Sequence, residues 1–179
     1  MKTAPNHILS IICTLLSGYL LSQTTGSKNA AVTLPIITLM DIEPAGNITL
    51  SFIAPTEAGR ALVNPAANTS KWINYTSAIA SGGVSRKITA SVNKLIPGID
   101  IRLQASAVSG SGSGTLGTTA GLVTLTTTPI TIISGIGGAY TGNGINNGHQ
   151  LTISLVPNNY SNLSAQSNTP VVITYTITE

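Results

Sequence analysis

The sequence predicts an all-β protein, and three observations lead to this prediction. Residues 171–178 alternate strictly, with Val171, Ile173, Tyr175 and Ile177 on one side, which is the period of a half-buried strand. Short alternating segments recur along the chain between turns rich in Gly, Pro and Asn. No segment beyond residue 26 has the period of a helix. The expected fold is a single immunoglobulin-like antiparallel β-sandwich of about 8–10 strands.

Composition points to an exported protein with one domain. The chain has 179 residues, of which 42% are hydrophobic and only 7% charged, against about a quarter charged in an ordinary globular protein. This combination excludes disorder caused by high net charge. The chain contains one Phe and one Trp, so the core is expected to consist of Ile, Leu, Val and Ala.

The N-terminus predicts a signal peptide at residues 1–26, followed by a β domain at residues 27–179. Lys2 gives a positive start and residues 8–21 are mostly apolar, which is too short for a typical membrane span. The alternatives are an uncleaved anchor, and a lipoprotein attached through Cys13 despite a poor lipobox. Cys13 is the only cysteine, so a processed chain would contain no disulfide. The expected location is secreted or at the cell surface.

The strands can be placed from the alternation and the turns between them. Pro35 indicates that the first strand lies at an edge or carries a bulge. The first two strands are expected to form a hairpin, and the fourth and fifth to pair across Pro97 and Gly98. The Gly-rich segments 109–117 and 135–148 are expected to be loops. The predicted strands are residues 32–43, 47–53, 71–76, 84–92, 99–108, 121–126, 129–133, 149–156 and 171–178.

Residues for catalysis or metal binding are scarce. A Ser-His-acid group needs a histidine, and beyond the signal only His149 is present, which we interpret as an exposed surface residue. Asp41 and Glu43 would share one face of a strand, but they are interpreted as solvated acids at a strand end. The sequence therefore predicts a non-enzymatic protein with no cofactor and no metal site. A hydrolase that uses His149 and Asp41 is a minor alternative.

Two kinds of partner remain after nucleic acid is excluded, because the basic residues are scattered and lack interleaved aromatics. One is a glycan bound by the loop at residues 138–148. Asn and Gly are also what positive-φ turns require, so a plain loop is the competing interpretation. The candidate ligand-binding residues are Tyr140, Asn143, Asn146, Asn147 and Trp72.

The other kind of partner is a further protein subunit. With its signal peptide, its cysteine-free mature chain and the alternating segments 32–37 and 171–178, the sequence resembles bacterial fimbrial subunits and spore-coat-U-like secreted domains. It departs from them in lacking a disulfide and in placing Tyr175 four residues from the end. The resemblance implies assembly by strand donation, in which the N-terminal strand of one subunit completes the sheet of the next.

We therefore expect an exported, non-enzymatic structural or adhesive surface subunit that resembles a component of a fimbria. It would associate with itself or with other surface subunits, and would meet the membrane only during export. The segment expected to donate a strand is residues 31–43. The alternative is a secreted carbohydrate-binding module that uses residues 138–148. The residues expected to pair during assembly are Val32, Leu34, Ile36, Val171, Ile173, Tyr175 and Ile177.

Overall fold

The structure is a computed structural model and describes residues 25–179. The predicted signal peptide lies outside the described residues except for its last two positions. The chain divides into two compact units, one ending at Leu34 and the other formed by Pro35–Glu179. In the first unit, residues 25–34 have no regular secondary structure and their side chains are exposed.

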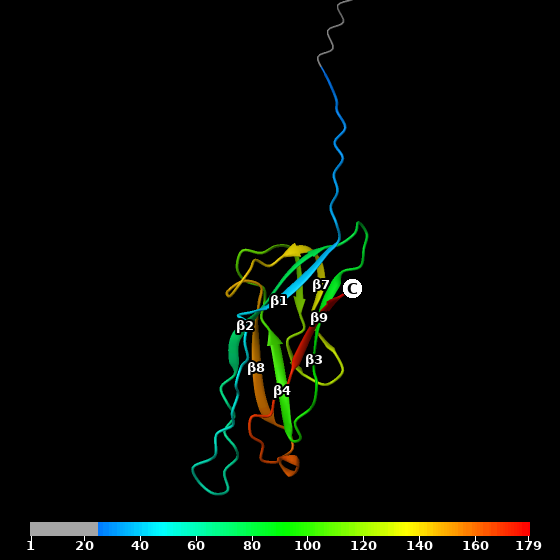
Figure 1. Cartoon of the computed structure of the whole chain (residues 1–179). Helices are drawn as coiled ribbons and strands as arrows, with labels where there is room; N and C mark the ends of the chain where they lie inside the picture. Colours follow the sequence, from blue (N-terminus) through cyan, green and yellow to red (C-terminus); the bar gives the residue numbers. More distant parts are fainter. Residues whose placement is uncertain (1–24) are drawn as a thin grey trace, which may run out of the picture. The chain divides into compact units, whose positions relative to one another are not determined.

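The regular secondary structure of the second unit consists almost entirely of antiparallel strands (Figure 1), which confirms the predicted all-β, sandwich-like class. Its one helical segment is a single 3-10 turn, η1 (Tyr160–Asn162). The strands are β1 (Ile37–Glu43), β2 (Asn68–Ala78), β3 (Arg86–Val92), β4 (Ile99–Ala105), β5 (Ser113–Thr119), β6 (Leu122–Thr124), β7 (Ile130–Tyr140), β8 (His149–Pro157) and β9 (Ile173–Thr178).

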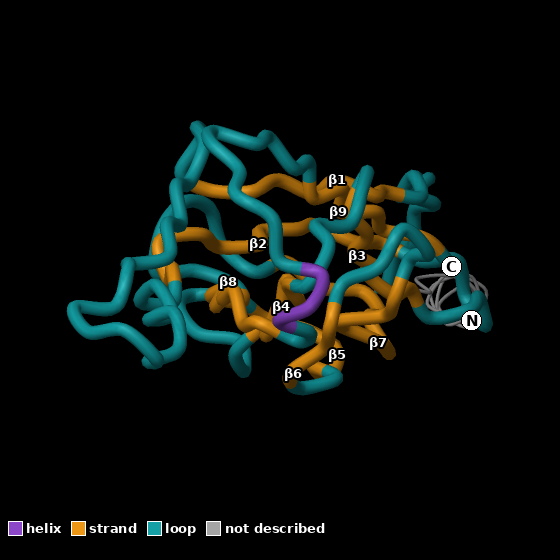
Figure 2. Tube along the Cα trace, turned by 90° about the horizontal axis from the view of Figure 1, so that it is seen from below, coloured by secondary structure: helices purple, strands orange, loops and turns teal. Residues whose placement is uncertain are grey.

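The strands form one hydrogen-bonded path, β6-β4-β8-β2-β7-β3-β9, with β1 added to β2 and β5 added to β7. Strand β2 pairs with β1 along one edge, and its other edge is divided between β8 and the end of β7. Strand β7 pairs with β3 and then, through its last two residues, with β2. These two strands therefore join the halves of the sheet, and the order β1, β2, β8, β4 can be followed in Figure 2.

The core consists of aliphatic side chains from the inward faces of the central strands. In β4 the inward residues are Ile101, Leu103 and Ala105, as the alternation predicts. In β8, Leu151 and Ile153 are buried as predicted. Each fully buried aliphatic side chain of this size contributes about 1.5–3 kcal/mol. Because aromatic residues are few, many β-branched side chains fill the core instead.

Two predicted strand pairings are wrong. Residues 47–53 do not form a hairpin strand; they make only an isolated bridge between Ile53 and Val63, and β1 pairs with β2 instead. Strands β3 and β4 do not pair with each other, since β3 lies between β7 and β9 while β4 lies between β6 and β8. Alternation identifies which side chains face the core, but it does not identify the neighbouring strand.

The two Gly-rich segments are more ordered than predicted. Strand β5 begins inside the predicted loop 109–117, and β7 continues into the predicted loop 135–148. Gly114 adopts φ +94°, and a Cβ atom there would lie 2.2 Å from the carbonyl oxygen of Gly138. Glycine therefore serves here to bring two strand backbones together at a shift in register, rather than to provide flexibility.

Arg86 fastens the beginning of β1 to its neighbours. Its side chain is buried, and its Nη1 atom donates hydrogen bonds to the carbonyl oxygen of Ile37 and the Oγ of Ser77, both at 2.7 Å. A longer bond of 3.3 Å reaches the carbonyl oxygen of Ala78. One cation on β3 thus satisfies acceptors on β1 and at the end of β2. In the sequence, this residue is only one of several scattered basic positions.

Replacing Arg86 with alanine is expected to lower the free energy of unfolding by about 2–4 kcal/mol, because the buried Ser77 hydroxyl and two partly buried carbonyl oxygens would lose their donor. Urea denaturation measures this loss, and hydrogen exchange should locate it in β1. The neighbouring exposed Lys87, whose Nζ donates to the carbonyl oxygen of Glu179, provides the control. Lys87→Ala should change stability by less than about 0.5 kcal/mol. Equal effects of the two substitutions would contradict the role given to Arg86.

Candidate functional site

The segment at residues 141–148 connects two strands that pair with the same edge of β2. Tyr140 at the end of β7 is opposite Thr76, and His149 at the start of β8 is opposite Ile73. Between them, Thr141 completes the ladder: its N–H donates to the carbonyl oxygen of Tyr75 at 3.0 Å, and its Oγ1 accepts from the N–H of Tyr75 at 2.9 Å. The connection is therefore held against the strand.

Asn74 fastens the middle of this connection to β2. Its side chain donates to the carbonyl oxygen of Asn147 and accepts from the N–H of Gly144, both at 2.7 Å. Gly148 has φ +75°, and a Cβ atom there would lie 2.1 Å from the carbonyl oxygen of Ile73. This is a position where the backbone approach requires glycine. The connection is thus a constrained structure rather than a free loop.

Two of the predicted ligand-binding residues belong to this framework. The Asn147 side chain accepts from the N–H of Ser111 and donates to the carbonyl oxygen of Asn143 at 2.8 Å. Asn146 adopts φ +65°, a left-handed conformation that asparagine tolerates better than most residues. The turn interpretation therefore accounts for both, and neither lines the pocket described next.

Two more of the predicted residues, Tyr140 at the end of β7 and Asn143 in the connection, line a shallow pocket of about 400 Å³. Asp41 and Leu39 of β1 and Thr76 of β2 border it as well. Trp72 lies on the same face of β2 as Thr76 but does not line the pocket. The sequence suggests Asp41 as a solvated acid at a strand end, or as a minor catalytic candidate, and does not predict its position beside Tyr140.

The residues predicted to pair during assembly fall into two groups. The first group is Val171 and, in β9, Ile173, Tyr175 and Ile177, whose side chains face the core but are only partly buried. Burial raises the pKa of Tyr175. By contrast, Val32 and Leu34 are 89% and 78% exposed, and Ile36 is also exposed. Residues 37–43 of the predicted donor form β1, paired within its own chain. The unpaired part of that segment is therefore residues 31–36.

The interpretation of His149 as a surface residue is wrong, because only 1% of the residue is exposed. Its Nδ1 lies 2.8 Å from the carbonyl oxygen of Ser106, and its Nε2 lies 3.1 Å from the hydroxyl of Tyr75. The Tyr75 hydroxyl also donates to the carbonyl oxygen of Leu116. The two rings stack with centroids 5.8 Å apart. The neighbouring Asn-Asn-Gly turn suggested exposure, but strand pairing places the ring in the interior.

Burial lowers the pKa of His149, although hydrogen bonding to the carbonyl oxygens of Ser106 and Leu116 opposes this effect. Burial also raises the pKa of Tyr75. Both groups are therefore favoured in their neutral forms. No side chain placed to act as a nucleophile beside His149 is apparent from its contacts, which are to backbone carbonyls and to Tyr75. This histidine links β8 to β2 and to the segment after β4.

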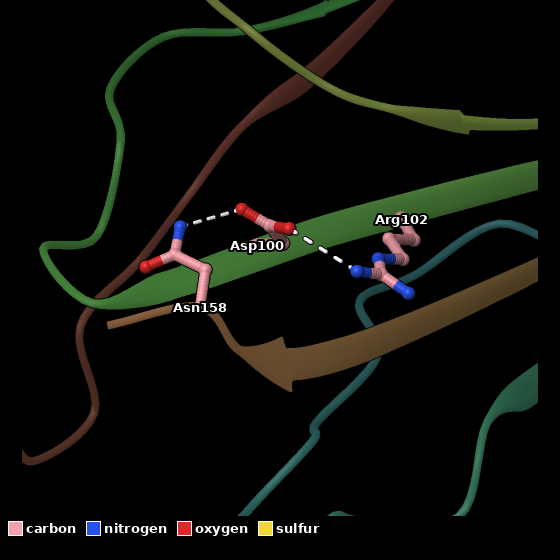
Figure 3. A network of polar contacts seen from close by, with 3 residues as sticks. All are labelled: Asp100, Arg102 and Asn158. Atoms are coloured by element: carbon pink, nitrogen blue, oxygen red, sulfur yellow. Dashed lines mark hydrogen bonds and ion pairs between the residues drawn. The ribbon is translucent and has the colours of Figure 1, made fainter. Parts of the chain in front are cut away.

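The remaining carboxylates are dispersed. Figure 3 shows Asp100, which accepts a hydrogen bond of 2.6 Å from the side-chain amide of Asn158 and forms an ion pair with Arg102 at 3.3 Å. This partly exposed pair contributes at most about 1 kcal/mol. Within residues 25–179, no three His, Cys, Asp or Glu side chains lie together in a way that could hold a metal ion. In the same residues, no helix is both long and apolar enough to cross a membrane.

Comparison of the chain with models of known protein families, with curated proteins and with solved structures finds no match in any of the three. The geometry itself therefore carries the functional argument. It offers two features, the partly covered strands β1 and β9 and the pocket beside Tyr140.

The buried state of His149 predicts a loss of stability in acid. The unfolded chain takes up a proton on this residue near pH 6.5, whereas the folded chain does so only at a lower pH. The free energy of unfolding should therefore decrease as the pH falls below about 6.5, by at most about 1.4 kcal/mol per pH unit from this group. Urea denaturation between pH 7.5 and pH 5 measures the slope.

In His149→Gln, the contribution of this residue to the slope should disappear, because glutamine does not titrate. The variant is expected to be less stable at pH 7.5, so the comparison uses the slope and not the absolute stability. An unchanged slope in the variant would contradict the assignment of the acid sensitivity to His149.

Proposed function

We propose that this protein is an exported, non-enzymatic structural subunit that assembles with further copies of itself at the cell surface by β-strand donation. In this assembly, residues 31–36 of one copy would form a strand along the partly covered edge of the next copy. The single observation that carries the proposal is that one chain contains both an unpaired alternating apolar segment and two strands whose core-facing side chains are incompletely covered.

The receiving edge would lie between β1 and β9. Strand β1 pairs only with β2 and β9 only with β3 among the described strands, and β1 and β9 lie near each other without forming a ladder. Each strand therefore has one edge of backbone N–H and C=O groups that is free to pair with an added strand. The first and last strands of the domain together supply this site.

The side chains beside these edges support the same location. Residues facing the core from β3, β4, β7 and β8 include many that are fully buried, whereas those from β1 and from the end of the chain are only partly buried. An added strand would cover more of this apolar surface. The partly buried set is Met40, Ile42, Val171, Ile173, Tyr175 and Ile177.

The proposed donor has matching chemistry. Val32, Leu34 and Ile36 alternate and are exposed, so they could enter the receiving edge on one side of an extended strand. Pro35 has no N–H to donate, so the added ladder should end near it. A second copy is the natural occupant, because every copy carries both the donor and the receiving edge.

Introducing negative charge into the donor segment should prevent assembly. The Val32→Asp and Leu34→Asp double variant is expected to weaken association by a factor of about 100 or more, because each buried side chain contributes about 1.5–3 kcal/mol. Light scattering after size-exclusion chromatography and electron microscopy of surface material are the measurements. Thr33→Asp, whose side chain would project from the opposite side, is the matched control and should still assemble. A wild-type protein that stays monomeric at all concentrations would contradict the proposal.

A cysteine pair separates donation between copies from insertion into the same copy. In a Cys13→Ser background, Leu34→Cys and Ile173→Cys are placed on separate chains, which are then mixed and oxidised. A disulfide between the two chains is expected. If both cysteines on one chain form only an internal disulfide and no mixed product appears, then the segment completes its own sheet and the protein does not assemble in this way.

Export is part of the same proposal, because assembly at the surface requires it. The N-terminal residue of the surface form should lie near residue 27. Sequencing of the N-terminus of material recovered from the cell surface or the medium tests this, and recovery of the protein only from the cytoplasm would contradict it.

A further inference from the structure

The pocket beside Tyr140 is bordered mainly by outward side chains of β1, although Met40, which also lies beside the proposed assembly edge, contributes to its lining. In β1, Leu39 and Asp41 are exposed, whereas Met40 and Ile42 are partly buried against the core. The pocket is thus bordered by outward side chains of a strand whose inward side chains belong to the core. Its lining is Leu39, Met40, Asp41, Asn74, Tyr75, Thr76, Tyr140, Gly142 and Asn143.

The groups that could contact a ligand differ in kind. Tyr140 is 50% exposed and Leu39 is 65% exposed, so both offer apolar surface. Asp41 offers carboxylate oxygens, of which Oδ1 already accepts a hydrogen bond from the N–H of Ile42. In the part of the chain that the structure describes, neither the hydroxyl of Tyr140 nor the side-chain amide of Asn143 has a hydrogen-bonding partner. These groups remain available for a ligand.

The pocket wall is held in place before any ligand binds. Thr141, next to Tyr140, is fully buried and completes the ladder of β2. The carbonyl oxygen of Asn143 accepts a hydrogen bond from the side chain of Asn147. The N–H of the next residue, Gly144, donates to the side chain of Asn74. Binding would therefore order few additional groups, which lowers its entropic cost.

This set of groups selects among ligand classes. The lining contains a carboxylate and no Lys or Arg, which disfavours anions. Calcium needs six to eight oxygen ligands, and Asp41 is the only carboxylate in the lining. A small neutral molecule with hydroxyl groups and an apolar face fits both parts, because a tyrosine ring offers a flat apolar surface and a carboxylate accepts hydrogen bonds from hydroxyl groups.

We propose that this pocket binds a neutral monosaccharide unit of a glycan. The sugar would place its C–H face against the ring of Tyr140, and two of its hydroxyl groups would donate to Asp41, while the amide of Asn143 would contact a third oxygen. The volume of about 400 Å³ is within the usual range for small-molecule sites. The proposal does not depend on strand donation, because none of the donor residues lines the pocket.

A glycan array followed by calorimetry with the best free saccharide tests the proposal, with the full chain as it is secreted. Tyr140→Ala is expected to weaken binding about tenfold or more, since an aromatic contact and its buried area contribute at least about 1.4 kcal/mol. Asp41→Asn keeps one acceptor oxygen but removes the charge, and should weaken binding by a smaller factor of about 3–10.

Tyr160→Ala and Glu57→Gln are the matched controls, because each removes an exposed tyrosine or an exposed acid that lies outside the pocket. Both controls should bind as the wild type does, and thermal unfolding checks that every variant is folded. Absence of binding to every neutral glycan on the array would overturn the proposal. So would binding that survives Tyr140→Ala in a folded variant.

The Val32→Asp and Leu34→Asp double variant distinguishes this proposal from the proposed function. It should retain the calorimetric affinity for the free saccharide even where it no longer assembles. If wild-type protein assembles but binds no glycan, the pocket proposal fails alone; if it binds glycan as a monomer at every concentration, strand donation fails alone.

Discussion

The pairing of β2 with three other strands determines most of what this domain can do. Because β1 occupies one edge of β2, while β8 and β7 divide the other, the backbone of Asn74 and Tyr75 lies where β7 ends and β8 has not yet begun. Thr141 hydrogen-bonds with the backbone of Tyr75 at this point, and this holds the connection at residues 141–148 against β2. The same arrangement leaves β1 as an outer strand. The position of the pocket and the free edge of β1 both follow from one strand and its partners.

Residues 25–179 carry few charges but include two buried cations, which show how polar groups are satisfied in this domain. Arg86 and Lys71 are both buried, and their hydrogen bonds run to backbone carbonyl oxygens and the hydroxyl of Ser77 rather than to carboxylates. Lys71 donates to the carbonyl oxygens of Pro44 and Gly46, just beyond β1. A buried cation is costly without such acceptors. These two residues therefore hold β1 near both of its ends, where strand pairing alone is weakest.

The sequence predicts the parts of this fold that depend on side-chain period and misses those that depend on which backbones meet. The inward faces of β4, β8 and β9 follow from alternation, because one face of each strand packs on the core. The ladder of β5 with β7 could not be predicted from period, because glycine has no side chain to reveal a face. For the pocket, Tyr140 and Asn143 were identified from the loop, but Asp41 comes from a strand about a hundred positions earlier in the chain. Only the register of β1 on β2 brings these residues together.

Assembly by strand donation would strengthen glycan binding by the pocket, because it would repeat the pocket along the assembly. Each of the two proposals can still fail alone. A shallow, open pocket with one aromatic ring and one carboxylate is expected to bind a single sugar weakly. In an assembly of many copies, however, the pocket recurs on the outward face of every β1 and β2 pair. Several weak contacts to one glycan-covered surface then raise the overall affinity by a factor of about 10² or more, provided that the spacing lets them bind together. The inward side chains of β1 would hold the assembly, and the outward side chains of the same strand would contact the ligand. A low-charge domain could in this way combine a structural role with adhesion.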